Sequence, residues 1–363
     1  MAKILYAIHG EGMGHAVRSM TIIEELKKRH DIEIIVGSSR AYEALKDLEN
    51  VTKIEGSKII YKNNAVANMK TIKDNLKIMV KHGSKNLKQI YKIIKKFQPD
   101  IIISDFENFT LYVSELFKIP VICLCNNHAV TELSYDVPRK YKKEYYKTKI
   151  VVEALSPNID YHLITSFFKL PVKGDNIFIY PPIIRKIIRE SISRRKNYVL
   201  VYQTSNTNSS LLNSLKKIDY KFIIYGFDKE EVDKNLTFKK FNQTEFIDDF
   251  RNCNSCISNG GFTFLTEAIY LKKPILSVPI KGQFEQTLNA MQIQRLGYGE
   301  FHDKLNKKSI ERFISNCDVY YKNLLAVKNE DNHRIIKKIE QIIKDTKKKI
   351  RYKSKRFGRT RKR

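Results

Sequence analysis

Two glycine-rich segments of this chain have residue types and spacings that can bind phosphate or move a proton. The first, at 9–15, reads His-Gly-Glu-Gly-Met-Gly-His, with glycines at positions 10, 12 and 14. Glycines let the backbone approach a ligand closely, and a helix that begins after such a turn presents free N–H groups. A neutral histidine at that helix start resists protonation, so His15 could act as a general base. The plainer interpretation is that His15 only caps the turn.

The second segment, at 258–263, reads Ser-Asn-Gly-Gly-Phe-Thr and leads into a predicted helix. A Gly-Gly turn at a helix start can hold a phosphate group through backbone N–H groups. Glu267, farther along that helix, could accept both hydroxyls of a ribose. Glu285, Gln286 and Asn289 follow the next strand, where they offer donors and acceptors for sugar hydroxyls. In this order and at these spacings, the features predict a site for a sugar joined to a phosphate.

A dinucleotide site is an alternative for the first segment. Its pattern is Gly-x-Gly-x-Gly rather than Gly-x-Gly-x-x-Gly, and a dinucleotide site also needs an acid about 20 residues farther on, at the end of the second strand. The residues there, 36–38, are Val-Gly-Ser. NAD(P) binding is therefore disfavoured.

The elements that must position these residues alternate between strand and helix patterns. In the first part of the chain, strands are predicted over 3–8, 32–36, 100–104 and 120–125, and helices over 16–28, 42–48 and 71–97. Strands separated by helices predict an α/β fold, a doubly wound parallel sheet with helices on both faces. Ligands then bind at the carboxyl ends of the strands.

A second α/β series begins after Pro181-Pro182, a stiff dipeptide suited to a linker. Its predicted strands are 198–202, 222–225, 256–258 and 274–278, with helices over 211–217 and 261–270. We therefore predict two facing Rossmann-like domains with a cleft between them. The predicted boundaries are 1–182, 183–346 with the closing helices, and a basic tail at 347–363.

Several side chains that follow first-half strands would open onto the cleft. Asp105 is placed to orient and charge-stabilise His15 in a His–Asp dyad, or simply to cap a helix. Glu11 and Glu107 are rival carboxylates for the base role. His128 could bind an acceptor hydroxyl or phosphate, although an ordinary loop contact explains it equally well. In the second half, the side chains of Gln-Thr-Ser-Asn at 203–206 could reach a diphosphate.

The segment 258–290 resembles the donor-site signature of nucleotide-sugar glycosyltransferases with two facing Rossmann-like domains, the GT-B fold. Among these enzymes it is most similar to the branch of the peptidoglycan N-acetylglucosaminyltransferases and the diacylglycerol galactosyltransferases. The turn at 9–15 resembles the first loop of that branch. The likeness covers about 1–325, and its specific motifs lie in 8–20 and 256–299.

This resemblance implies that the first domain binds the acceptor and the second binds the donor. It implies that the turn residues hold the diphosphate through backbone N–H groups; these are Gly260, Gly261, Phe262 and Thr263. It also implies that Glu267 contacts the ribose, and that Glu285, Gln286 and Asn289 lie near the donor sugar and diphosphate. His15 would lie against the acceptor hydroxyl or donor phosphate, and the other residues on that side are Gly12, Gly14, Arg18 and His128. The chain departs from the pattern with Glu285, where the peptidoglycan enzymes have Gln, and with Arg18, where many relatives have Pro.

We therefore expect a glycosyltransferase that moves a sugar from a UDP-sugar to a hydroxyl acceptor, either a glycan or a lipid-linked molecule. A single His–Asp base suits one in-line displacement, which predicts inversion. No Asp-x-Asp pair follows a strand, so we expect neither a metal nor a cofactor beyond the nucleotide sugar. The helix start at Gly261, helped by Arg18 or Lys281, would neutralise the diphosphate.

Two other functions stay open from the sequence alone. A UDP-N-acetylglucosamine 2-epimerase uses the same two-domain frame, and would give product without an acceptor. A non-catalytic basic protein that binds membrane or nucleic acid is the other. The chain has 67 Lys and Arg against 39 Asp and Glu, a net charge of +28, and 347–363 contains no acid. That charge reflects either background composition or an anionic partner, for which a membrane surface is favoured over nucleic acid.

Composition excludes several classes of protein. With 42% hydrophobic residues the chain can fill a core, so disorder of the whole chain is excluded. No apolar run is long enough to span a bilayer, and the first residues lack a secretory pattern. The five cysteines do not predict a disulfide framework, and Cys253 and Cys256 form a single Cys-x-x-Cys without a second pair, so neither zinc nor redox chemistry is predicted there. We expect a cytoplasmic protein, with a peripheral position at the membrane face as a further possibility.

Overall fold

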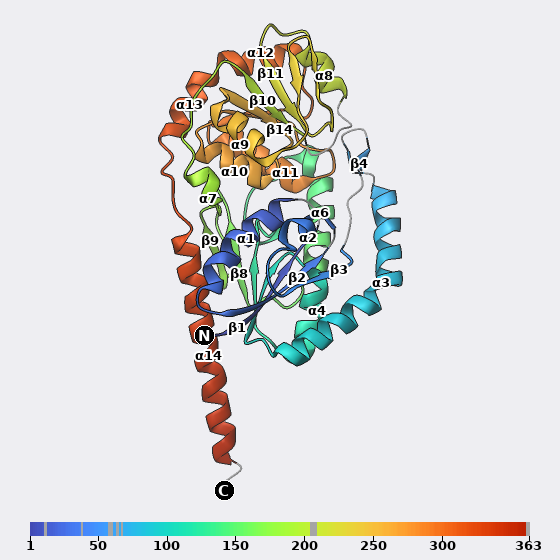
Figure 1. The fold of residues 1–363 in the computed structure, drawn as a ribbon, viewed down its shortest axis with the longest axis vertical. Helices are drawn as coiled ribbons and strands as arrows, with labels where there is room; N and C mark the ends of the chain where they lie inside the picture. Colours follow the sequence, from blue (N-terminus) through green and yellow to red (C-terminus); the bar gives the residue numbers. More distant parts are fainter. Residues whose placement is uncertain are drawn as a thin grey trace.

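Two α/β halves form the molecule, one above the other in the computed structural model (Figure 1). The structure describes residues 1–10, 13–37, 39–56, 61–62, 65–66, 68–203 and 209–360. Each half is built on a seven-stranded sheet, which confirms the predicted α/β class with two Rossmann-like units. Within the described ranges, none of the helices combines the length and the apolar character that crossing a bilayer would require.

The first sheet has the order β3-β2-β1-β6-β7-β8-β9, and all its neighbouring strands are parallel. Its strands are β1 (Lys3–Ile8), β2 (Asp31–Gly37), β3 (Val51–Ile54), β6 (Ile101–Asp105), β7 (Val121–Leu124), β8 (Tyr161–Thr165) and β9 (Ile177–Tyr180). A small antiparallel pair, β4 (Tyr61–Lys62) and β5 (Ala65–Val66), lies outside this sheet. The helices are α1 (Met13–Lys27), α2 (Ser39–Leu45), α3 (Asn68–Phe97), α4 (Asn108–Phe117), α5 (Ala129–Glu132) and α6 (Lys142–Leu155), with a 3₁₀ turn, η1, at Arg139–Tyr141.

The second sheet has the order β12-β13-β11-β10-β14-β15-β16 and is parallel except for its β12–β13 edge. Its strands are β10 (Val199–Tyr202), β11 (Phe222–Tyr225), β12 (Glu231–Asp233), β13 (Leu236–Phe238), β14 (Ser255–Ser258), β15 (Ile275–Ser277) and β16 (Gly299–Phe301). The helices are α7 (Lys186–Arg189), α8 (Ser209–Leu215), α9 (Gln243–Asn252), α10 (Phe262–Tyr270), α11 (Phe284–Arg295), α12 (Lys307–Ser315), α13 (Cys317–Leu325) and α14 (His333–Thr360).

Apolar strands explain why each sheet is covered on both faces. Along β1, Ile4 and Ile8 belong to the core on one face, whereas Leu5 belongs to the core on the other. Successive side chains of a strand point to opposite faces, so a strand that is apolar at every position needs helices on both sides. A further apolar cluster joins the two halves, with Phe284 and Leu288 of α11 packed among residues of the first half.

The last helix crosses back to the first half. Ile335, Ile339 and Ile343 of α14 pack into the core around β1, and Figure 1 shows α14 running alongside that half. The prediction that 183–346 forms one domain therefore does not hold for this helix. The chain thus passes between the halves twice, near Ile184 and just before α14. Asn332 links these two segments, because its side chain exchanges hydrogen bonds of 3.0 and 3.1 Å with the backbone of Ile184.

Candidate active site

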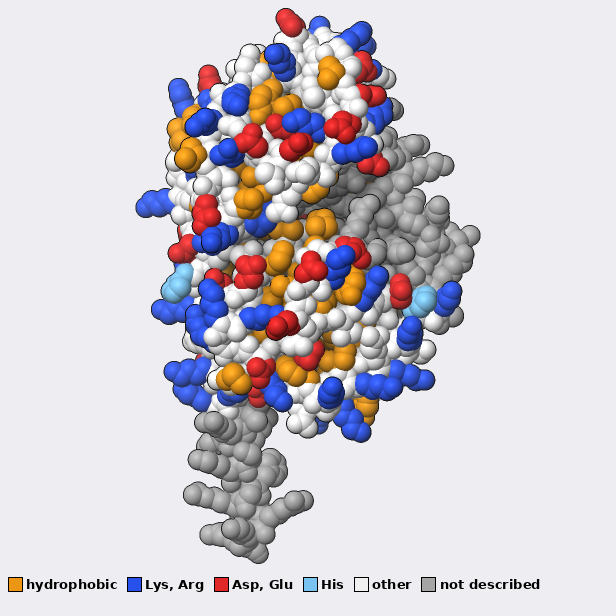
Figure 2. All heavy atoms as spheres, viewed as in Figure 1, with side chains coloured by type: hydrophobic (Ala, Val, Ile, Leu, Met, Phe, Trp, Pro, Cys, Tyr) orange, Lys and Arg blue, Asp and Glu red, His pale blue; other side chains and the backbone are white. Residues whose placement is uncertain are grey.

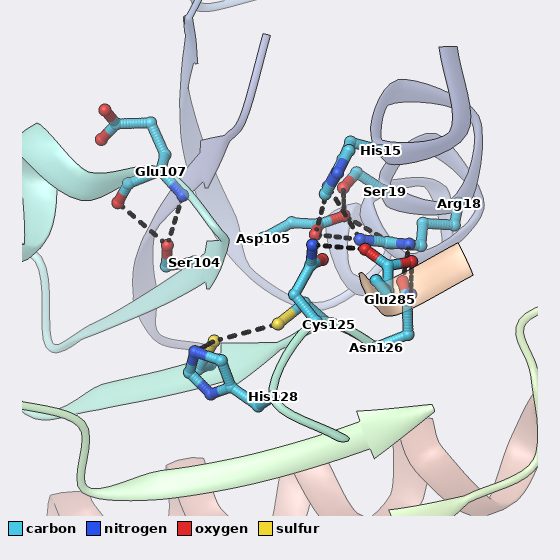
Figure 3. A network of polar contacts seen from close by, with 12 residues as sticks. His15, Arg18, Ser19, Ser104, Asp105, Glu107, Cys125, Asn126, His128 and Glu285 are labelled. Atoms are coloured by element: carbon cyan, nitrogen blue, oxygen red, sulfur yellow. Dashed lines mark hydrogen bonds and ion pairs between the residues drawn. The ribbon is translucent and has the colours of Figure 1, made fainter. Parts of the chain in front are cut away.

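A buried polar network lies where β1 and β6 end. The two strands are parallel neighbours with Ile8 opposite Asp105, so the turn after β1 comes beside the Asp105 carboxylate. Because α1 begins at Met13, His15 lies in its first turn, and His15 Nδ1 lies 2.8 Å from Asp105 Oδ1 (Figure 3). The His15 side chain keeps 15% of its surface exposed, whereas that of Asp105 is buried. The structure thus brings together the two residues predicted as a dyad.

Arg18, one turn farther along α1, holds the same carboxylate. Arg18 Nε donates to Asp105 Oδ2 at 2.7 Å, and Arg18 Nη2 donates to Asp105 Oδ1. Ser19 Oγ donates to Asp105 Oδ2 at 3.0 Å, and Arg18 Nη1 donates to Asn126 Oδ1 at 2.5 Å. A guanidinium matches a carboxylate in this two-pronged way better than any other side chain. Arg18 is therefore committed to internal contacts rather than free to meet a phosphate.

These contacts keep the Asp105 carboxylate ionised. Burial by itself would raise the pKa of Asp105, but the positive charge of Arg18, the electrostatic effect of His15 and the hydrogen bonds of both lower it further than burial raises it. The net pKa lies well below the usual range of an aspartate. Asp105 in turn raises the pKa of Arg18, against the effect of burial. The site therefore contains a fixed pair of opposite charges beside a histidine.

The network crosses the boundary between the two halves, which we call the seam. It reaches the second half through Glu285, in the first turn of α11. Asn126 Nδ2 donates to Glu285 Oε1 at 2.6 Å, and Asn127 Nδ2 donates to Glu285 Oε2 at 2.8 Å. Asn126 therefore bridges Arg18 on one side and Glu285 on the other, as Figure 3 shows. Glu285, predicted near the donor sugar, lies against Asn126 and Asn127 of the first half.

The glycine turn before α10 is shaped by backbone contacts rather than by charges. Gly260 has a φ of +88°, and a Cβ built there would lie 2.8 Å from the Gln286 carbonyl oxygen, so both conformation and space require glycine. Gly261 caps α10 in extended backbone, and a Cβ on it would meet no atom within 4 Å. Gln286 Oε1 accepts from the Ile280 N–H at 2.9 Å, and Asn289 Nδ2 donates to the Gly260 carbonyl at 3.1 Å. Asn289 therefore holds the glycine turn through the Gly260 carbonyl, whereas Gln286 holds the backbone that follows β15.

The two glycine turns meet. A Cβ on Gly14, near the start of α1, would lie 2.8 Å from Thr263 Oγ1, near the start of α10. The first turns of both helices therefore lie side by side, with His15 on one and the open position at Gly261 next to the other. Because the first N–H groups of an α-helix have no partner within the helix, two helix starts in the same region suit an anionic ligand.

Glu267 has a partner that the sequence did not suggest. Arg185, from the connection after β9, donates to Glu267 through Nε and Nη2, each at 2.6 Å from a carboxylate oxygen. Glu267 is 2% exposed; burial raises its pKa, and the contacts with Arg185 oppose that rise. A ribose bound as predicted would have to share this carboxylate with Arg185.

Two predicted roles are corrected by the structure. His128 is 2% exposed, and its ring nitrogens lie 2.8 Å from His162 Nδ1 and 2.9 Å from Ser156 Oγ, so the prediction that it binds an acceptor is wrong. Glu107 is the N-cap of α4, where its carboxylate accepts two backbone N–H groups, and it is not available as a base. Both side chains follow strands, but they contact neighbouring groups of the first half.

Some predicted residues lie outside the described part of the chain: Glu11, Gly12 and the 204–206 segment. Gln203, which begins that segment, is buried and accepts from Asn259 Nδ2 at 2.9 Å. One residue that sequence reasoning did not assign is His9, whose ring centroid lies 5.2 Å from that of His15. Burial, followed by the electrostatic effect of His15, lowers the pKa of His9 to about 3. Its position at the end of β1 was the signal that could have identified it.

Comparisons with known proteins point the same way as this geometry. The model of a family described as glycosyl transferase family 1 matches residues 2–318. The chain is 26% identical to an uncharacterized glycosyltransferase of Methanosarcina mazei, over 82% of this chain and 84% of that protein. It is 24% identical to the UDP-N-acetylglucosamine–N-acetylmuramyl-(pentapeptide) pyrophosphoryl-undecaprenol N-acetylglucosamine transferase 1 of Bacillus thuringiensis, over 94% of this chain and 99% of that protein.

Solved structures show the same architecture. The glycosyltransferase of kitacinnamycin superposes with a TM-score of 0.67 at 14% identity, over 94% of this chain and 98% of that one. MurG of Acinetobacter baumannii superposes with a TM-score of 0.56 at 12% identity, over 93% and 99%. At these identities the likeness shows the fold. Together with the sequence relatives, it confirms the predicted resemblance to GT-B glycosyltransferases related to the peptidoglycan N-acetylglucosaminyltransferases.

Proposed function

The chain belongs to glycosyl transferase family 1 and is a glycosyltransferase, and on that premise we propose that it moves a sugar from a UDP-sugar to a hydroxyl acceptor. We propose further that the acceptor is a glycan or a lipid-linked molecule, that the transfer inverts the anomeric carbon, and that it needs no metal. The observation that carries this proposal is the juxtaposition of the two helix starts, with the His15–Asp105 pair on one side and the glycine turn on the other.

His15 supplies the base in this proposal. Asp105 is ionised and can only accept, so a hydrogen on His15 Nδ1 makes the 2.8 Å contact favourable and leaves Nε2 to take a proton. Arg18 Nη2, which donates to Asp105 Oδ1, also lies 2.7 Å from the same ring nitrogen. Nε2 takes the proton of the acceptor hydroxyl while the oxygen bonds to the sugar's anomeric carbon. The bond from that carbon to the diphosphate breaks, and UDP leaves with the electron pair.

The donor diphosphate lies at the start of α10 in this proposal. Gly261 leaves open space beside the backbone N–H groups of that helix, whose positive dipole end favours an anion. Charge stabilisation by fixed N–H groups takes the place of a divalent cation. Because one relative is named for transfer from UDP-N-acetylglucosamine, that nucleotide sugar is the first donor to test.

A position at an anionic membrane surface is a further part of the proposal. The segment 347–363 is rich in Lys and Arg, and Figure 1 shows the end of α14 extending beyond the body of the molecule. Figure 2 shows basic and acidic side chains mixed over the face in view, which favours the tail over that face as the basic element. Deleting 347–363 should abolish sedimentation with anionic vesicles and preserve transfer to a soluble acceptor.

The direct test is release of UDP from UDP-N-acetylglucosamine, UDP-glucose and UDP-galactose in the presence of an acceptor panel. Acceptor-dependent UDP release is the expected result. The control omits the acceptor: epimerised sugar formed under that condition would instead support the 2-epimerase function. Calorimetry with the same three nucleotide sugars, followed by no binding of any of them, would contradict the proposal.

A further inference from the structure

Behind the loop that contacts Glu285, three potential metal ligands face one another. Cys123 Sγ lies 3.5 Å from Cys125 Sγ and 3.9 Å from His128 Nε2, and the ligand atoms of all three residues lie within 4.8 Å of one another. Cys123 belongs to β7 and Cys125 follows it, so their side chains point to the same side of the strand. His128 enters from the start of α5, and Figure 3 shows it in the same part of the network as Cys125.

The distances suit a tetrahedral metal ion. With zinc–sulfur bonds of about 2.3 Å and a zinc–nitrogen bond of about 2.0 Å, tetrahedral angles place two sulfurs about 3.8 Å apart and a sulfur and a nitrogen about 3.5 Å apart. Movements of a few tenths of an ångström convert the observed 3.5 and 3.9 Å into these values. The third pair, Cys125 and His128, has its ligand atoms within 4.8 Å of each other, so a side-chain rotation must draw them together as the ion binds. Both thiols are free, and a disulfide would need the sulfurs at about 2.05 Å.

The surroundings of His128 are those of a metal-binding imidazole. With Nε2 directed at the sulfurs, Nδ1 lies 2.8 Å from His162 Nδ1, an outer hydrogen-bond partner that fixes the ring's tautomer and orientation. Ser156 Oγ, 2.9 Å from Nε2, places a hydroxyl at the edge of the cluster, where it or a water bound to it can complete four-fold coordination.

Charge also favours a divalent cation here. The side chains of both cysteines and of His128 are buried, and Phe106 and Val152 pack around the sulfurs. Two thiolates and a neutral imidazole exactly cancel the charge of a dication, so the complex adds no net charge to this apolar pocket. We propose that Cys123, Cys125 and His128 form a structural zinc site.

The site would stabilise the loop that joins the two halves. Its ligands Cys125 and His128 flank Asn126 and Asn127, the two residues whose amides hold Glu285 across the seam. An ion at this position fixes both ends of that short loop and takes no part in sugar transfer, because its ligands are buried behind the loop. The zinc proposal is therefore independent of the proposed metal-free transfer. If the zinc site is absent, the proposal for sugar transfer is unaffected.

The test uses the full-length, reduced protein and measures metal directly. Purified protein should contain about one zinc ion per chain, and Co²⁺ added to the metal-free protein should give an intense thiolate-to-cobalt charge-transfer band. The double variant Cys123→Ser and Cys125→Ser should lose both signals. Cys253→Ala, which removes a buried thiol of the other half, should keep them. His162→Ala should bind Co²⁺ about 10–100-fold more weakly.

Titration of the unaltered protein with Co²⁺ tests the metal site even if a variant fails to fold. A saturable charge-transfer band at one Co²⁺ per chain, displaced by Zn²⁺, supports the site. Absence of that band at micromolar protein and metal, or a band that persists in the double cysteine variant, overturns it. Removing the zinc should also lower the melting temperature, and an unchanged melting temperature would contradict a structural role.

Discussion

The two glycine turns of this molecule occupy the same place in similar half-structures and yet differ in what they present. After β1, the start of α1 provides side chains: His15, Arg18 and Ser19 converge on Asp105. After β14, the start of α10 provides backbone: Gly260 adopts a positive φ and the residues that hold it do so through amides. One turn is specialised by ionisable groups and the other by shape.

This difference assigns separate tasks to the two halves. A proton must be received by a group with a defined ionisation state, which requires side chains and fixed charges around them. A diphosphate can be held by N–H groups alone, which requires that no side chain stands in the way. Both turns are close enough to touch at Gly14 and Thr263, so the two tasks can act on one donor–acceptor pair.

Replacing His15 should have the largest effect, a loss of transfer rate without a loss of donor affinity. His15→Ala removes the partly exposed imidazole beside Asp105 and should lower the rate of transfer about 10²–10⁴-fold, the usual contribution of a general base. The affinity for the UDP-sugar should not change, because the donor is held by the other turn. Steady-state rates and calorimetric donor titration measure the two effects. If the variant keeps full turnover, the first turn does not supply the base.

Charge removal on the two sides of the seam should have unequal effects. Asp105→Asn leaves Arg18 buried beside a neutral amide and should lower the free energy of unfolding by about 3–5 kcal/mol. Glu285→Gln is the matched control, since that carboxylate accepts from the neutral amides of Asn126 and Asn127 and is partly exposed. Its effect should stay near 1 kcal/mol, the typical contribution of a hydrogen bond. Denaturant unfolding of both variants measures the difference, and equal losses would contradict it.

The sequence predicted the strand–helix order and the two turns because glycine spacing and apolar runs are local signals. It also predicted that Asp105 lies beside His15, because parallel strands bring their carboxyl ends to one edge. It did not predict the pairing of Arg185 with Glu267 or the burial of His128, since both depend on contacts between residues far apart in the chain. The return of α14 to the first half was missed for the same reason: an amphipathic helix does not specify which core its apolar face joins.

Acid should destabilise the histidine side through His9. The pKa of His9 is lowered to about 3 in the folded protein by burial and by His15, with Arg18 acting in the same direction and Asp105 in the opposite one. In the unfolded chain a histidine titrates near about 6.5, so between the two values the unfolded state binds the extra proton. Stability therefore falls as the pH is lowered, by about 1.4 kcal/mol per pH unit for this one group.

Comparing His9→Gln with the unaltered protein isolates this effect. Urea unfolding at several pH values between 7 and 4.5 should show a slope that is smaller in the variant by one proton's contribution. Identical slopes would mean that His9 does not stay neutral in the folded protein.

Two neighbouring glycines test the other turn, and they should separate stability from binding. Gly260→Ala places a Cβ against the Gln286 carbonyl in a backbone conformation unfavourable for alanine, and should cost about 1–3 kcal/mol of stability. Gly261→Ala meets no atom within 4 Å and has an ordinary φ of −63°, so its stability should change by less than about 0.5 kcal/mol.

If the open position at Gly261 is where the diphosphate lies, the same methyl group should weaken donor binding about tenfold, or about 1.4 kcal/mol. Thermal unfolding and calorimetric titration with UDP measure the two quantities on the same samples. Unchanged UDP affinity in Gly261→Ala would place the diphosphate elsewhere, because a Cβ in this empty space has nothing else to displace. The turn before α10 would then no longer be assigned to diphosphate binding, whereas the assignment of His15 as the base would be unaffected.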